Sequence, residues 1–315
     1  MAIEEYEAIR LFNEECLQVP PFMAAFSAIK DLVQLYRSTG VAQNLIVLGE
    51  TGSGKTTLCK MILRDYPRVV LPDRDLLPIL VVAVPPAATL ASVAEAMLTR
   101  LGDPAPSAGT VSAKTARVIH LARMCGVEAI LIDEANHIQD RGRAYTQYHV
   151  GDWIKALMDE LGIPIVMLGL PRVEALFATN EQLRRRFTRR MRLELGQDPD
   201  TPIETQCLQL FTSMALWLPM KFSRGGMTWS ELGHRLRFAT DGRVAYLKVL
   251  MMGALRTAYA NACDAIAVQQ LEHAFTTEIW PAGVAELNPF HPAFAFRCLD
   301  RLGEPFERGA IAKRN

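Results

Sequence analysis

A glycine-rich loop in the first fifth of the chain has the residue types that bind phosphate. The segment 48–60 reads LGETGSGKTTLCK and fits G-x-x-x-x-G-K-[ST] at every fixed position. Glycines let backbone N–H groups converge on phosphate oxygens, and the following helix presents the positive end of its dipole. A strand-type segment, 44–48, precedes the loop, and a helix-type segment, 57–63, follows it. This context predicts a nucleoside triphosphate site rather than a glycine-rich turn without a ligand.

The polar residues of this loop have separate expected roles. We expect Lys55 to reach the β- and γ-phosphates and the Thr56 hydroxyl to hold Mg²⁺. The expected nucleotide-binding residues are Gly49, Glu50, Thr51, Gly52, Ser53, Gly54, Lys55, Thr56 and Thr57.

Two carboxylates follow an apolar strand in AILIDE, at 129–134. We expect Asp133 to hold Mg²⁺ through water and Glu134 to polarise the attacking water. An Asp-Glu pair after a strand is common by itself, but together with an upstream phosphate loop it indicates nucleotide hydrolysis. The guanine-reading pattern N-K-x-D is absent from the sequence, so we expect ATP rather than GTP.

A third candidate is the basic segment NEQLRRRFTRRMRLEL, at 180–195. Six of the nine residues from Arg184 to Arg192 are arginine. An arginine directed at a neighbouring subunit's ATP can neutralise charge that develops on the γ-phosphate. We expect one of these arginines to act as such a finger and the others to form a solvated basic edge. Arg243, after Gly242, could touch the phosphates within its own chain, with an ordinary structural role as the alternative.

Alternating strands and helices must position these groups. Apolar runs of strand length follow the phosphate loop, and the segments 88–101 and 113–124 between them have helical spacing. The expected strands are 44–48, Leu80–Val84, Ala129–Asp133, Pro164–Gly169 and Met191–Leu195. The pattern predicts an α/β fold, a parallel five-stranded sheet with helices on both faces, and a ligand at the carboxyl ends of the strands.

Beyond about residue 200 the pattern is helical only. Capping boxes are expected at Thr201, with Pro202 at the first helical position, and at Thr228. Further helices are expected from Arg243 to about Ala262 and from Val268 to about Thr277. The predicted organisation is an N-terminal helical segment (1–43), the P-loop core (44–199), a helical lid (200–288) and a loosely packed C-terminal tail (289–315).

Composition restricts the function classes. Lys plus Arg and Asp plus Glu are both 34, so any DNA contact needs a local basic patch. The six cysteines contain no C-x-x-C pair, which argues against zinc and against a disulfide scaffold. The acidic N-terminus is unlike a signal peptide, and the longest uncharged stretch, 76–94, is broken by prolines. We therefore expect a cytoplasmic protein without a membrane span.

The order of these elements resembles AAA+ ATPases, and more closely the TniB/TnsC family. Members of that family are ATP-dependent target-selection regulators of bacterial DNA transposons. The resemblance covers roughly residues 20–289, in GETGSGKTT, ILIDEANHI, IKALMDELGIPIVMLG, NEQLRRRF and ATDGRVAYLKVLMMGAL before NPF. The QLxxRF element and the GR before the lid helix are the most specific of these motifs. By position, Arg186 matches the family's arginine finger, with Arg185 as the fallback, and Arg243 matches the sensor arginine of the lid.

The chain departs from the family after the fourth strand. The family usually has Gly-Thr there, whereas Gly169 is followed by Leu170, which cannot hydrogen-bond the γ-phosphate or the lytic water. We therefore expect slow hydrolysis, with ATP acting mainly as an assembly switch. Asn136 is a candidate for the missing polar contact.

The resemblance also implies partners. Similar proteins form ATP-dependent rings or helical filaments on double-stranded DNA without sequence preference, and they recruit and stimulate a transposase, in some cases with a target-selector protein. Candidate DNA contacts are Lys114, Arg117, Arg141 and Arg143, with an ordinary solvated charge as the alternative for each. Two other functions stay open. One is a replication initiator or helicase loader, although few residues follow the lid for a helix-turn-helix domain. The other is a nucleotide-driven switch that oligomerises on a protein partner.

Overall fold

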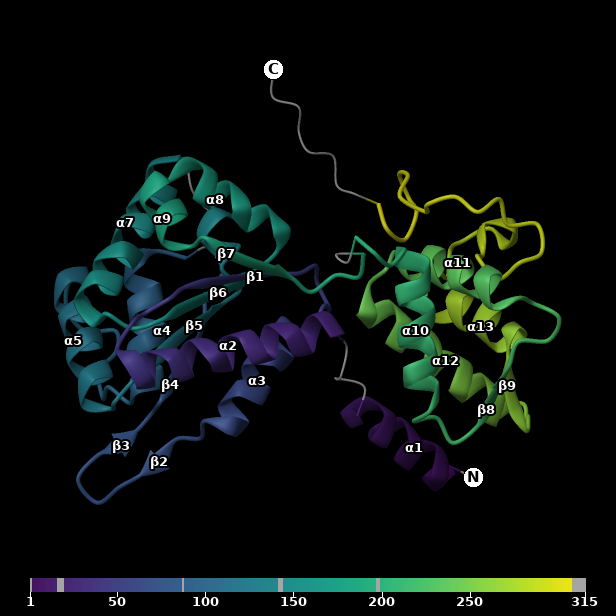
Figure 1. Cartoon of the computed structure of the whole chain (residues 1–315), viewed down its shortest axis with the longest axis horizontal. Helices are drawn as coiled ribbons and strands as arrows, with labels where there is room; N and C mark the ends of the chain where they lie inside the picture. The colour runs from purple at the N-terminus through teal and green to yellow at the C-terminus, as the bar shows by residue number, and fades with distance from the viewer. Residues whose placement is uncertain (1, 16–19, 87, 141–143, 197–198, 308–315) are drawn as a thin grey trace. The chain divides into compact units, whose positions relative to one another are not determined.

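The computed structural model describes residues 2–15, 20–86, 88–140, 144–196 and 199–307. The chain forms two compact units (Figure 1). The core unit comprises residues 21–193, and the lid unit comprises residues 1–20 and 194–315. The core unit ends at Leu193, whereas the sequence predicts that it ends at residue 199.

A parallel five-stranded sheet forms the centre of the core unit, in the order β4-β5-β6-β1-β7. Its strands are β1 (Leu45–Leu48), β4 (Ile79–Ala83), β5 (Ala129–Asp133), β6 (Ile165–Gly169) and β7 (Arg189–Arg192). The central strands β1, β5 and β6 are buried along their whole length. Helices flank the sheet (Figure 1), so the predicted fold class is confirmed.

The edge strand β7 differs from the expected Met191–Leu195. Leu45 pairs with Arg189 and Leu48 with Arg192, so the strand begins two residues earlier and consists largely of arginine. The residues of β7 are exposed or half-buried, and charged side chains are common on edge strands, where they discourage pairing with other chains. The apolar run identified the neighbourhood of the strand but not its register.

The helices of the core unit follow the expected alternation. They are α2 (Pro20–Thr39), α3 (Lys55–Asp65), α4 (Leu90–Leu101), α5 (Val111–Met124), α6 (His137–Asp140), α7 (Ala144–Leu161), η1 (Pro171–Val173), α8 (Glu174–Thr179) and α9 (Glu181–Arg186). Thr89 and Thr110 cap α4 and α5 by accepting hydrogen bonds from backbone N–H groups. A short hairpin of β2 (Val69–Val70) and β3 (Asp75–Leu76) forms a separate small sheet.

The lid unit is mainly helical. It contains α1 (Ala2–Glu15), α10 (Ile203–Ala215), α11 (Trp229–Thr240), α12 (Val244–Ala260), α13 (Val268–Ala274), η2 (Phe275–Ile279) and η3 (Ala285–Leu287). Two short strands that the sequence did not predict, β8 (Lys221–Ser223) and β9 (Ala265–Ala267), pair in parallel. Helix α1 contacts α12 and buries Ala8 and Phe12. The expected segment 1–43 is therefore divided, with α1 in the lid unit and α2 in the core unit.

Of the two expected capping boxes, the one at Thr228 is present only as an N-cap, and the one at Thr201 is wrong. The Thr228 hydroxyl accepts a 3.1 Å hydrogen bond from the backbone N–H of Glu231, so Thr228 is the N-cap of α11. Helix α10 instead has Pro202 at its N-cap, without a side-chain cap. The side chain of Gln206 bonds both the Thr201 carbonyl and the Gly196 N–H. This interaction holds the loop before α10 in place of a threonine cap.

The expected loose packing of the C-terminal tail is wrong for residues 289–307. Its large side chains Phe290, Phe294, Leu299 and Phe306 are buried. The buried guanidinium of Arg235, in α11, donates to the carbonyl oxygens of Pro289 and His291 at 2.6 and 3.0 Å. These contacts make the segment part of the lid unit. None of the helices that the structure describes is long and apolar enough to cross a bilayer.

Candidate nucleotide-binding site

A pocket of about 220 Å³ lies where three buried strands of the core unit end. The phosphate loop follows β1, Glu134 follows β5 and Leu170 follows β6. The pocket is lined by Thr51, Gly52, Gly54, Lys55, Thr56, Thr57, Glu134 and Leu170. The structure thus brings together the phosphate loop and the expected catalytic carboxylate.

The backbone of the loop depends on glycine. Gly52 and Gly54 have φ values of +80° and +94°, in the region that side chains disfavour. A Cβ atom on Gly49 would lie 2.2 Å from the Ser53 hydroxyl oxygen. Because α3 begins at Lys55, its first N–H groups and the positive end of its dipole lie at the pocket. This arrangement suits an anion such as a polyphosphate.

Two polar groups of the loop fit a phosphate ligand. The Lys55 side chain is 5% exposed, and its ammonium donates to the carbonyl oxygens of Gly49 and Glu50 at 2.8 and 3.0 Å. The Ser53 hydroxyl is buried without a hydrogen-bond partner in the part of the chain that the structure describes. Buried polar groups normally have partners, so this orphan points to a bound group.

The two expected magnesium ligands are in direct contact. The Thr56 hydroxyl donates to Asp133 Oδ2 at 2.9 Å, and Asp133 is 3% exposed. The described residues contain no cluster of three His, Cys, Asp or Glu side chains suited to a metal. Mg²⁺ needs no such cluster, since it is commonly held by one or two protein oxygens together with substrate phosphates and water. The donor set therefore fits a magnesium–nucleotide complex.

A cysteine lies behind the loop on α3. Burial, with a smaller contribution from the charge of Asp133, raises the pKa of the Cys59 thiol well above its usual value. A thiol that stays protonated is a poor nucleophile, so Cys59 has a packing role here.

Glu134 sits in a sharp turn after β5. It is a non-glycine residue with φ at +55°, and its backbone N–H donates to Asp133 Oδ1 at 2.9 Å. Its carboxylate accepts a 3.2 Å hydrogen bond from the side-chain amide of Asn136. Left-handed backbone in a residue other than glycine often marks functional sites.

The candidate finger Arg186 is the last residue of α9 and does not line the pocket. Its guanidinium forms a 2.5 Å ion pair with Asp159 of α7. Its carbonyl accepts a 3.2 Å hydrogen bond from Asn44, just before β1. The fallback Arg185 is 78% exposed and pairs with Glu181 on its own helix. The sequence did not identify Asp159, because no motif in residues 157–161 (LMDEL) distinguishes it from an ordinary surface carboxylate.

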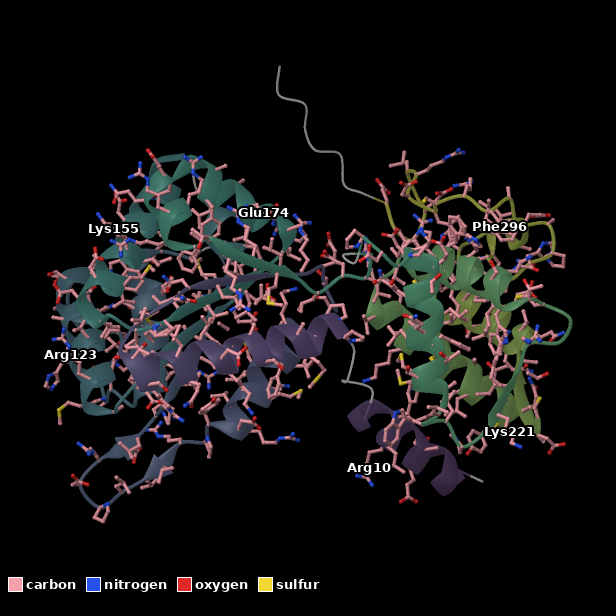
Figure 2. The ribbon with its side chains drawn as sticks, in the orientation of Figure 1. Arg10, Arg123, Lys155, Glu174, Lys221 and Phe296 are labelled. Carbon is pink, nitrogen blue, oxygen red and sulfur yellow. The ribbon has the colours of Figure 1, made fainter. Side chains whose placement is uncertain are left out.

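Of the other arginines of the basic segment, Arg184 lies on α9, and Arg189, Arg190 and Arg192 lie on the edge strand β7. Arg190 and Arg192 pair with Glu174 of α8, labelled in Figure 2, at 3.8 and 2.9 Å. The described part of the chain gives Arg184 and Arg189 no ion-pair partner, and both are exposed. This placement agrees with the expected solvated basic edge.

Arg243 belongs to the lid unit, where it is the N-cap of α12. Its guanidinium pairs with Asp241 at 3.1 Å and lies 5.8 Å from the centres of the Tyr246 and Phe306 rings. Within its own unit, Arg243 thus joins α12 to the tail.

The candidate DNA contacts are only partly described. Lys114 is 4% exposed and forms an ion pair with Glu95, so its charge is neutralised below the surface. Arg117 pairs with Asp103 at 2.9 Å and donates to the Ala105 carbonyl. This arrangement argues against Lys114 as a DNA contact and leaves Arg117 with little free charge. Arg141 and Arg143 lie outside the described residues.

The fold is similar to several solved structures of low sequence identity. Cdc6p from Pyrobaculum aerophilum aligns over 84% of this chain and 69% of its own, with 13% identity and a TM-score of 0.60. The ORC2 protein of Aeropyrum pernix, in its ADPNP–ADP complexes, aligns over 85% and 71%, with 14% identity and a TM-score of 0.57. The Aeropyrum pernix ORC1 protein, in complex with DNA, aligns over 80% and 64%, with 15% identity and a TM-score of 0.55.

The parallel sheet of the core and its likeness to these structures show an AAA+ P-loop fold. No curated protein matches the chain. The model of the bacterial TniB protein matches residues 10–194, which span the phosphate loop, the Asp-Glu strand and the basic segment. With those three elements inside the match, the chain belongs to the bacterial TniB family.

Proposed function

We propose that this protein is an ATP-dependent regulator of DNA transposition. It assembles as a homo-oligomer, a ring or a helical filament, on duplex DNA without sequence preference, and there it recruits or activates a transposase, in some cases with a target-selector protein. The observation that carries the ATP-dependent part is the convergence of Lys55, the Thr56–Asp133 pair and Glu134 at one pocket. The transposition part is supported by membership of the TniB family.

In the proposed reaction, each group at the pocket has one task. The Lys55 ammonium gives up its hydrogen bonds to the loop carbonyls and donates to the β- and γ-phosphate oxygens instead. The backbone N–H groups of the loop enclose the triphosphate. Thr56, and Asp133 through water, would hold Mg²⁺, and the ion would neutralise phosphate charge. Glu134 orients a water molecule in line with the γ-phosphate and accepts its proton. Arg186 of a neighbouring subunit and Arg243 of the lid add positive charge to the same phosphate.

Two further parts of the proposal concern location and DNA. The five cysteines that the structure describes are all free thiols, which supports the cytoplasmic part of the proposed location. Membership of the TniB family supports the proposed association with DNA. The exposed basic edge around Arg184 and Arg189 is a candidate DNA-facing surface, since these side chains have no ion-pair partner in the described structure. Arg117, Arg141 and Arg143 remain weaker candidates.

A replication-initiator role is the second candidate, favoured by the fold's likeness to Cdc6p and the ORC proteins. A nucleotide-driven switch on a protein partner is the third. Sedimentation with two duplexes of unrelated sequence, with and without ATP, separates these functions. Equal ATP-dependent pelleting with both duplexes, together with faster strand transfer by the partner transposase, supports the regulator. Pelleting with one duplex only favours an initiator, and assembly without DNA favours the switch.

Glu134→Gln should separate nucleotide binding from hydrolysis. The amide keeps the size of the side chain and removes only the group that accepts the proton of water. We expect ATP binding and DNA assembly to be retained and turnover to fall at least about 10²-fold. Steady-state phosphate release measures the effect, and Glu160→Gln, an exposed carboxylate on α7, is the matched control. Unchanged turnover in Glu134→Gln would move the catalytic role to another residue.

A further inference from the structure

We propose that Asn136 is a positioning residue for hydrolysis, which fixes the Glu134 carboxylate by joining it to the end of β6. The inference rests on the proposed ATPase activity and adds a residue to its site. It also changes the role expected for Asn136. The side chain does not line the pocket, so it acts through Glu134 rather than on the nucleotide.

The Asn136 side chain forms two hydrogen bonds in opposite directions. Its Nδ2 donates to Glu134 Oε2 at 3.2 Å, and its Oδ1 accepts from the backbone N–H of Leu170 at 3.3 Å. Asn136 is 2% exposed, so the amide itself is shielded from water, whereas the Glu134 side chain is 38% exposed. A buried amide satisfied on both sides holds its rotamer firmly. It therefore joins the two pocket-lining residues that follow β5 and β6.

The local backbone brings these groups together. Glu134 adopts its left-handed conformation while the Ala135 N–H donates to the Leu168 carbonyl at 2.9 Å, so the chain after β5 turns toward β6. At Gly169, a Cβ atom would lie 2.6 Å from a Val173 methyl group and 3.4 Å from the Asn136 Oδ1 atom. A larger residue at 169 would clash with Val173, so the glycine allows the close packing of η1 against the end of β6, beside the amide.

The pattern of bonds suits a general base. Asn136 occupies Oε2, and the structure gives no hydrogen-bond partner to Oε1 among the described residues. One oxygen is thus anchored while the other can accept a proton from water. His137 Nε2 lies 3.9 Å from Oε2, on the anchored side. The apolar side chain of Leu170 supplies no polar group to orient the water. The orientation of the water therefore depends more strongly on the position of the Glu134 carboxylate.

A purely structural role for Asn136 makes a different prediction. If Asn136 serves only to hold the end of β6, its acceptor oxygen for the Leu170 N–H is the important group. Asn136→Asp keeps that acceptor and the side-chain shape but loses the donor to Glu134. Asn136→Ala loses both. The two substitutions therefore separate positioning of Glu134 from support of β6.

The test measures ATP-analogue binding, steady-state turnover and thermal unfolding for wild type and both variants, with Mg²⁺ and duplex DNA. We expect nucleotide affinity within about twofold of wild type and a fall in kcat of about tenfold or more in both variants, since small misplacement of a catalytic group has effects of this size. Asn288→Asp, a similarly buried amide in the lid unit, is the control for placing a carboxylate in the interior. It should lower the unfolding temperature and retain turnover per folded molecule.

Three results with the variants would overturn the inference alone. If Asn136→Asp keeps wild-type turnover and only Asn136→Ala loses turnover, then Asn136 serves to support the end of β6. Faster turnover in Asn136→Ala would mean that the amide restrains Glu134 away from its working position. Wild-type turnover in both variants would remove the role altogether. A wild-type protein that binds ATP and assembles without ever hydrolysing it would instead contradict the proposed ATPase, and the inference with it.

Discussion

Lys55→Ala should abolish nucleotide-dependent assembly. Among the described residues that line the pocket, Lys55 is the only cation, so no other group there can replace its contact with the β- and γ-phosphates. Hydrogen bonds to charged groups contribute roughly 1.5–3 kcal/mol each, and the loss of two such bonds weakens binding by at least about 10²-fold. Titration with a fluorescent ATP analogue measures the loss of nucleotide binding, and ATP-dependent pelleting on DNA measures the loss of assembly.

The control for this substitution is Lys60→Ala, which removes an exposed lysine from the same helix. The Lys55 ammonium also bonds the carbonyls of Gly49 and Glu50, so thermal unfolding must be followed in both variants. We expect Lys60→Ala to bind the analogue as wild type does. Analogue binding of wild-type strength in folded Lys55→Ala would show that the phosphate-loop assignment is wrong.

The parts of the site that could be predicted are those whose chemistry requires a fixed local spacing. A phosphate loop needs its glycines, Lys55 and Thr56 at set intervals between a strand and a helix, and the structure has this arrangement. The Asp-Glu pair is also local, because an apolar run places both carboxylates at the end of β5. Contact between Thr56 and Asp133 follows once both strands are parallel members of one sheet.

The parts that could not be predicted depend on contacts between residues far apart in the chain. Lys114 has the charge of a DNA contact, yet its burial and its pairing with Glu95 follow from the packing of α4 against α5. Repeated prolines and a basic end predict a loosely packed tail. In the structure, however, three phenylalanines of the tail are buried within the lid unit. Asp159 carries no local signal, and only the packing of α7 beside α9 brings it to Arg186.

Arg186→Ala tests whether the active site is shared between subunits. In the free subunit Asp159 holds this guanidinium at 2.5 Å, with both side chains partly exposed. Such an ion pair contributes only about 0–1 kcal/mol, so a neighbour's γ-phosphate can displace Asp159 on assembly. We expect the variant to bind ATP nearly normally as a monomer, to hydrolyse it on the order of 10³-fold more slowly, and to lose ATP-stabilised assembly on DNA.

Mixing the variants separates a finger that acts in a neighbouring subunit from one that acts within its own. Arg186→Ala has an intact phosphate loop and Lys55→Ala has an intact finger, so mixed interfaces should recover part of the activity that both proteins lack alone. Arg185→Ala is the matched control, because among the described residues Arg185 pairs only with Glu181 on its own helix. If Arg185→Ala loses hydrolysis and Arg186→Ala keeps it, the finger is Arg185. Co-assembly of the mixture without any recovery would count against a shared active site, and the arginines from Arg184 to Arg192 would then be a surface for DNA or a partner only.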